Sequence, residues 1–74
     1  MEPMDLIDKL SAMMAEELEG AAKYAHCALK HKADHAKLAE MFHTMAGQEM
    51  EHAKHLQEAI AAEFKAMQDM YEQA

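Results

Sequence analysis

The chain has 74 residues, a single cysteine and a net charge of −7 at neutral pH, so it forms at most one small domain without an intrachain disulfide. Its acidic balance argues against nucleic acid or an anionic membrane as partners, and no apolar stretch is long enough for a membrane span or a signal peptide. We therefore expect a soluble, cytoplasmic protein that gains stability from self-association or a bound metal.

The first predicted element is a helix over residues 4–30. Alanine, leucine, methionine, glutamate and lysine dominate this stretch, and its apolar residues recur at three- and four-residue spacing. The positively charged run Lys30-His31-Lys32 breaks the pattern and suits the end of a helix, so a turn is predicted over residues 31–34. Asp34 is suited to cap the helix that follows.

The second predicted element is a longer helix over residues 35–72. Its last turns, from about Phe64 onward, extend past the first helix and either pack on another chain or bend back as a short third element. Each helix carries one apolar stripe that a single hairpin cannot bury fully, whereas two hairpins can. The fold class expected is therefore all-α. Residues 1–74 form a single half-domain, an antiparallel two-helix hairpin that dimerises into a four-helix bundle.

Two glutamates interrupt these apolar stripes. Glu17 follows Leu10 by seven residues, and Glu49 follows Phe42 by seven residues. Measured from the middle of the turn, at Lys32–Ala33, Glu17 lies about 15 residues before it and Glu49 about 16 residues after it. At about 1.5 Å of rise per residue, an antiparallel hairpin brings both carboxylates to one level, about 23–25 Å from the bend. His52 projects from the same stripe as Glu49, so three ionisable groups are expected to meet.

Such a cluster favours a metal site. Burying a carboxylate without a partner costs several kcal/mol, and a divalent cation between Glu17 and Glu49 removes that cost. The alternative is that each glutamate pairs with a lysine, or that a protonated His52 neutralises a carboxylate. Mixed carboxylate and imidazole ligands suit iron or manganese. In a two-fold dimer the set doubles to four glutamates and two histidines, so one chain is predicted to supply half of a di-metal site.

A second Glu-x-x-His pair, Glu40 and His43, flanks the apolar stripe and faces no acidic residue of the first helix. We interpret this pair as solvated surface. Gly20 lies inside the first helix at some cost in stability, one turn from Glu17. It is expected to allow close helix approach or to leave room for metal and substrate, whereas the sequence offers no explanation for Gly47.

Two motifs resemble those of the ferritin-like, rubrerythrin-type di-iron proteins. Glu17 is followed seven residues later by Tyr24, as in the first-helix pattern of that family, and Glu49-Met50-Glu51-His52 is similar to its second-helix Glu-x-x-His. The separation of 32 residues between the two glutamates also fits. Only one half of the usual four-helix chain is present, which resembles the half-length encapsulated ferritins. The resemblance covers about residues 10–60.

The resemblance implies a role for each site residue. Glu17 and Glu49 would be the carboxylate ligands, His52 the imidazole ligand, and Tyr24 a catalytic residue that hydrogen-bonds a ligating carboxylate. It implies iron as the cofactor, two ions per dimer and one per chain, with manganese or zinc as substitutes. The expected partners are a second copy, a ring-like oligomer and an encapsulin shell. The short C-terminal tail that targets such cargo to this nanocompartment is not visible after Gln73.

Three functions follow from the sequence. The first is a ferroxidase-type oxidoreductase that oxidises Fe(II) to Fe(III) between two subunits, for iron storage or detoxification. The second is a rubrerythrin-like peroxidase that responds to oxidative stress, which requires a separate electron donor because the chain lacks paired Cys-x-x-Cys motifs. The third is a non-catalytic helical-hairpin module for oligomerisation, with a structural metal or polar cluster.

Overall fold

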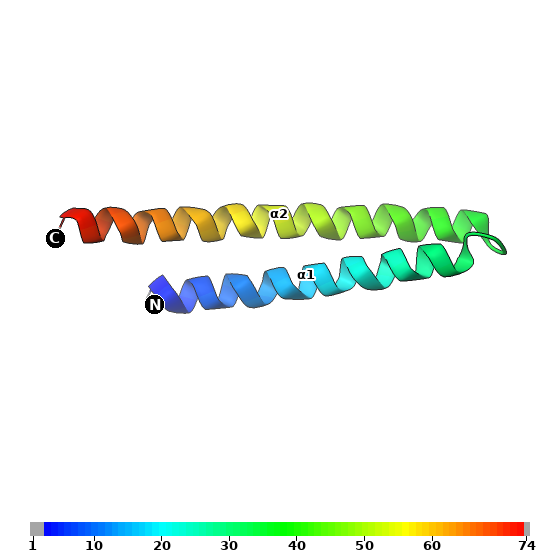
Figure 1. Ribbon diagram of the computed structural model, residues 1–74, viewed down its shortest axis with the longest axis horizontal. Helices are drawn as coiled ribbons and strands as arrows, with labels where there is room; N and C mark the ends of the chain where they lie inside the picture. The colour runs from blue at the N-terminus through cyan, green and yellow to red at the C-terminus, as the bar shows by residue number, and fades with distance from the viewer. Residues whose placement is uncertain (1–2, 74) are drawn as a thin grey trace.

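The computed structural model describes residues 3–73 as two long helices. Helix α1 spans Pro3–His31 and helix α2 spans Ala36–Gln73, and the two run antiparallel as a hairpin (Figure 1). The described residues contain no β-strand. The predicted all-α hairpin is therefore confirmed. No helix in this part of the chain is both long and apolar enough to cross a membrane.

The turn between the helices is short and held by backbone hydrogen bonds. The amide of His35 donates to the carbonyl of His31 over 2.9 Å, and the amide of Ala39 donates to the carbonyl of His35 over 2.9 Å. His35 therefore holds the N-cap position of α2, because its carbonyl accepts the first bond of that helix. The expectation that Asp34 is the cap was wrong: its carboxylate lies in the turn, 3.6 Å from Nδ1 of His31.

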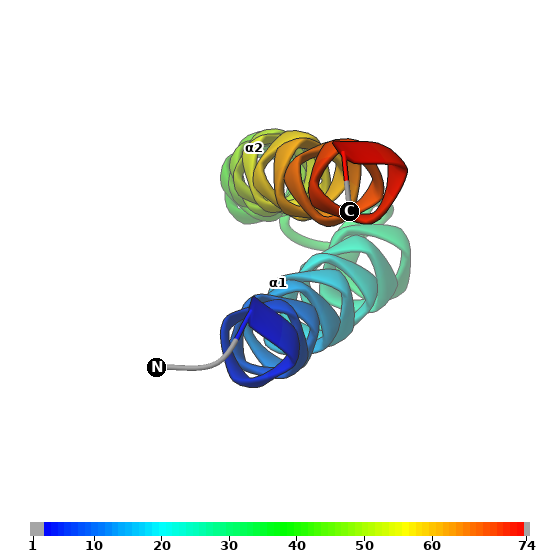
Figure 2. The same cartoon turned by 90° about the vertical axis from the view of Figure 1, so that its left-hand side faces the viewer.

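The contact between the helices is made mainly by small side chains. The buried residues are Ile7, Ala21, Ala39 and Ala53, and no side chain in the described chain has an exposed fraction under 2%. Alanine on both sides lets the helices approach closely, but it buries little apolar area. The molecule is correspondingly thin, with extents of 61 × 15 × 13 Å. The end-on view in Figure 2 shows one layer of two inclined helices with both faces open.

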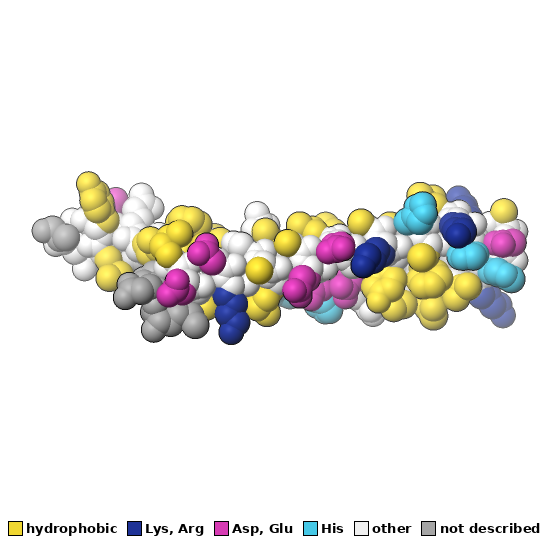
Figure 3. Space-filling model, turned by 90° about the horizontal axis from the view of Figure 1, so that it is seen from below, with side chains coloured by type: hydrophobic (Ala, Val, Ile, Leu, Met, Phe, Trp, Pro, Cys, Tyr) yellow, Lys and Arg dark blue, Asp and Glu magenta, His cyan; other side chains and the backbone are white. Residues whose placement is uncertain are grey.

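Large apolar side chains remain exposed along the whole hairpin, as the hydrophobic atoms in Figure 3 show. Helix α2 has 38 residues against 29 in α1, and it continues past the start of α1 as one unbroken helix (Figure 1). The alternative of a short third element is therefore not adopted within residues 3–73. On this overhang, Phe64, Met70 and Tyr71 are 51%, 65% and 84% exposed.

Candidate metal centre

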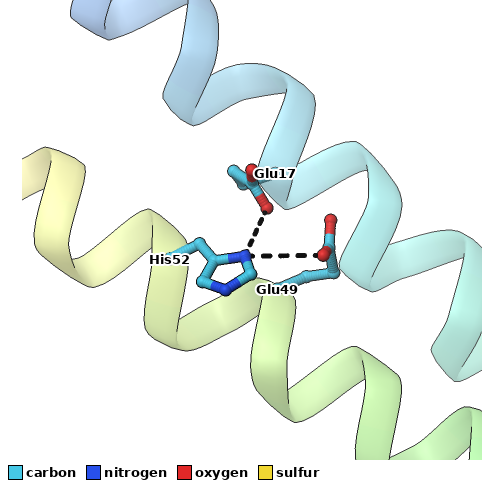
Figure 4. A group of neighbouring side chains, drawn as sticks. All are labelled: Glu17, Glu49 and His52. Atoms are coloured by element: carbon cyan, nitrogen blue, oxygen red, sulfur yellow. Dashed lines mark hydrogen bonds and ion pairs between the residues drawn. The ribbon is translucent and has the colours of Figure 1, made fainter.

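Three side chains from the two helices converge near the middle of the hairpin. Glu17 projects from α1, while Glu49 and His52 project from adjacent turns of α2, and all three point toward one another (Figure 4). Residues three apart on a helix share a face, which explains why Glu49 and His52 point the same way. Glu17 and Glu49 lie at nearly the same distance from the turn, which explains why the carboxylate of Glu17 on α1 lies level with that of Glu49 on α2.

The distances within the group are close to those of a metal-ligand set. Nδ1 of His52 lies 3.2 Å from Oε2 of Glu17 and 3.6 Å from Oε1 of Glu49. One potential ligand atom from each residue lies within 4.8 Å of the others. Donors about 2.1 Å from an ion stand about 3.0–3.4 Å apart, so small side-chain adjustments would complete the shell. Two carboxylates and an imidazole are donors that iron and manganese accept.

The group lies at the surface of the hairpin rather than inside it. The side chains of Glu17 and Glu49 are 28% and 26% exposed, and that of His52 is 56% exposed. A single chain therefore surrounds the cluster on one side only. The half-exposed position leaves room for further ligands from outside the hairpin.

No lysine among the described residues forms an ion pair with either carboxylate of the cluster. The lysine ion pairs join residues four apart on one helix, Lys23 with Glu19 and Lys65 with Asp69. Glu19, which lies two residues after Glu17, is exposed and forms that surface pair with Lys23. Of the alternatives to a metal, the pairing with lysine is not formed, and His52 is the partner of both carboxylates.

The surroundings of the Glu49 carboxyl raise its pKa. A hydrogen bond with Glu17 raises the pKa of the Glu49 carboxyl, and partial removal from water and the negative charge of Glu17 raise it further. His52 lowers the pKa of Glu49, but by less than the other causes raise it. A cation bound between the two carboxylates would offset the repulsion between their negative charges.

Tyr24 lies on the same stripe of α1 as Glu17, but away from the cluster. Its ring stacks on that of Phe42, with centroids 6.1 Å apart and planes 20° apart. Within the described residues its hydroxyl makes no hydrogen bond to Glu17 or Glu49. Its expected contact with a ligating carboxylate is therefore not formed inside one hairpin, and the role of Tyr24 stays a prediction.

The second Glu-x-x-His pair lies elsewhere on the molecule. Glu40 and His43 are exposed, and they line a separate groove of about 650 Å³ between the helices, near the turn. This groove is walled mainly by alanines and includes Lys32. The residues of the pair are not members of the cluster around Glu17. The two pairs share a sequence motif, but they project from different faces of α2 and lie at different distances from the turn.

Comparison with known proteins identifies one family. The family model for rubrerythrin matches residues 8–74, which covers most of α1, all of α2 and all three residues of the cluster. No curated protein and no solved structure gives a significant match. The motifs around Glu17 and Glu49, the helical hairpin and the family match agree with one another. The chain belongs to the rubrerythrin family, and it is a di-iron protein of the ferritin-like type.

Proposed function

We propose that two copies of this chain form a di-iron ferroxidase site between them and oxidise Fe(II) to Fe(III) for iron storage or detoxification. The observation that carries the proposal is the convergence of Glu17, Glu49 and His52 on an open face of the hairpin. Three donors from one chain leave the coordination of one ion incomplete. The same three donors from a second copy give four carboxylates and two imidazoles, enough for two ions.

The surroundings of the cluster support assembly through this face. Met13 precedes Glu17 by one helical turn and is 43% exposed, and Met45 precedes Glu49 by one turn. Helical geometry places both methionines on the side of the cluster. A two-fold pairing of this face with itself buries apolar side chains around the carboxylates, and it strengthens their attraction for a cation by excluding water.

In the ferroxidase reaction iron is the substrate, and two Fe(II) ions each give up one electron. Oxygen takes the pair with two protons to form hydrogen peroxide, or hydrogen peroxide takes the pair with two protons to form two waters. The protein's part is to bind and orient. Glu17 and Glu49 balance the charge of the cations, and His52 adds a nitrogen donor.

The test is iron stoichiometry combined with turnover. Fe(II) is added without air, oxygen is then admitted, and ultraviolet absorbance and particle mass by light scattering are followed. We expect about one iron per chain in a dimer or larger assembly, with rapid oxidation. His52→Ala should lose both binding and oxidation, and the matched control His43→Ala should keep them. A folded dimer that takes up no iron would refute the proposal, and metal binding without oxidation would indicate a structural site.

A second candidate function is a rubrerythrin-like peroxidase, and the family match favours it. The same residues would hold iron as a resident cofactor, and hydrogen peroxide would be the substrate. Because the chain has one cysteine, the electrons would come from a separate donor. Stopped-flow measurements with oxygen and with peroxide distinguish the two, since a peroxidase turns over peroxide repeatedly when a reductant is supplied. Ring-like assembly and residence in the cytoplasm or an encapsulin shell stay predictions.

A further inference from the structure

Gly20 of α1 lies directly against the side chain of Glu49. A Cβ atom placed on Gly20 would stand 2.6 Å from Oε2 of Glu49, 3.5 Å from its Cδ and 3.7 Å from its Cγ. A distance of 2.6 Å is too short for an oxygen and a carbon that are not bonded, so any other residue at this position forces the carboxylate to move. The obstructed group is the end of a flexible side chain, and the hairpin can accommodate the movement.

The backbone gives no other reason for a glycine at this position. No glycine in the described chain has a positive φ, and Gly20 is an ordinary residue of α1. Glycine in the interior of a helix is less stable than alanine. Gly47 carries the same disadvantage in α2, yet a Cβ placed there meets nothing within 4 Å. The two glycines therefore differ in one respect, which is the contact with Glu49.

The two oxygens of the Glu49 carboxylate have different neighbours. Oε1 faces His52, 3.6 Å from Nδ1, while Oε2 lies over Gly20. With glycine at this position, the carboxylate fits against α1 and keeps a ligand atom within 4.8 Å of those of Glu17 and His52. A methyl group on residue 20 would displace Oε2 and turn the carboxylate away from this arrangement.

We propose that Gly20 is a positioning residue of the metal site, which keeps open the space that the Glu49 carboxylate needs to reach Glu17 and His52. This inference rests on the proposed function, because it concerns the same site. Gly20 touches no ion itself and acts only through Glu49. The destabilisation that Gly20 causes in α1 is offset by the free energy of metal binding when the site is filled.

The test compares Gly20→Ala with the matched control Gly47→Ala. Both variants replace a helical glycine by alanine, so both metal-free proteins are expected to unfold at a higher temperature than the wild type, by about 4–8 °C. Binding of Mn(II) is measured from the electron paramagnetic resonance signal of the free ion. Gly20→Ala should bind Mn(II) at least about tenfold more weakly than the wild type, while Gly47→Ala binds it as tightly.

A rise in stability together with a fall in Mn(II) affinity identifies a positioning role. If Gly20 had only a structural role, its replacement by alanine would stabilise the protein without weakening metal binding. A second variant, Gly20→Val, should weaken binding further than Gly20→Ala. The inference is overturned if Gly20→Ala binds Mn(II) as tightly as the wild type, or if Gly47→Ala loses as much affinity. Absence of binding in the wild type itself overturns the proposed function, and this inference with it.

Discussion

Replacing Glu49 by glutamine is the sharpest single test of the metal centre. Glutamine has the shape of glutamate but no charge, so Glu49→Gln removes one ligand without creating a cavity. The ionised carboxylate of Glu49 is disfavoured beside Glu17, as its raised pKa indicates. The metal-free variant should therefore be at least as stable as the wild type at neutral pH, while its response to metal is lost.

The size of that loss follows from mass action. Metal at about 100 times its dissociation constant stabilises the folded protein by about 2.7 kcal/mol. Glu49 is one of three protein donors, 3.6 Å from Nδ1 of His52. Loss of a group that only supports a metal ligand weakens binding by about 10–100-fold, so we take removal of Glu49 itself to weaken it by about 100-fold. The remaining stabilisation is then about 0.4 kcal/mol. The difference of about 2.3 kcal/mol corresponds to about 9–18 °C in the unfolding temperature of a domain of this size.

The assay is thermal unfolding followed by circular dichroism, with and without Mn(II) at one fixed concentration. The matched control is Glu40→Gln, which makes the same change in the other Glu-x-x-His pair and should keep the full metal-dependent rise. The reasoning fails if Glu49→Gln retains most of that rise, or if Glu40→Gln loses it. A large loss of stability in metal-free Glu49→Gln would also contradict the repulsion between the two carboxyl groups.

Three further predictions concern pH, assembly and Tyr24. The pKa of Glu49 is higher in the folded state than in the unfolded chain, so the folded state binds more protons near that pKa. Ionised Glu49 therefore destabilises the folded state above that pKa, and this destabilisation disappears as the pH falls through it. In metal-free thermal melts, any stability advantage of Glu49→Gln over the wild type should vanish as the pH falls through the pKa of Glu49. Mn(II) should also bind more weakly as the pH falls, because protons compete for the carboxylate. A stability advantage that grows toward acid pH would contradict this prediction. Leu56→Arg lies one turn after His52 on the side of the cluster and should reduce the sedimentation mass to that of one chain. Met50→Arg, in a different groove that Leu18 and Ala21 also line, should not, and equal effects of the two variants would place the interface elsewhere. Tyr24→Phe should leave the stability of the hairpin within about 0.5 kcal/mol, because the Tyr24 hydroxyl makes no hydrogen bond to any of residues 3–73. The same variant should slow iron oxidation in stopped flow without changing iron stoichiometry, and an unchanged rate would remove Tyr24 from the site.

Much of the fold could be predicted because it depends on local patterns. Apolar spacing and the basic run before Asp34 locate two helices and one turn, and counting residues from that turn places Glu17 level with Glu49. The straight course of α2 follows from the lack of a glycine or proline after Phe64. The choice of His35 rather than Asp34 as the cap could not be read from preferences alone, because the backbone bonds of a short turn decide it.

The details of the site depend on the packing of one helix against the other, which no single-helix pattern contains. The contact of Gly20 with Glu49 requires the close approach that Ala21 and Ala53 allow. The sequence placed Gly20 near the site but could not say which side chain fills the space. Whether a lysine would reach the carboxylates was also open. In the structure the lysine ion pairs are made with acidic residues on their own helix, because those lie closer.

The small core of the hairpin has a consequence for how iron binding would respond to the cell. Three alanines and one isoleucine are buried in the described chain, too little to make the folded single chain strongly stable. If the metal site is completed by a second copy, folding, pairing and metal uptake form one linked equilibrium, and iron affinity then rises with the concentration of the chain. The level of expression would thus set the threshold at which iron is captured, with no modification or separate effector required.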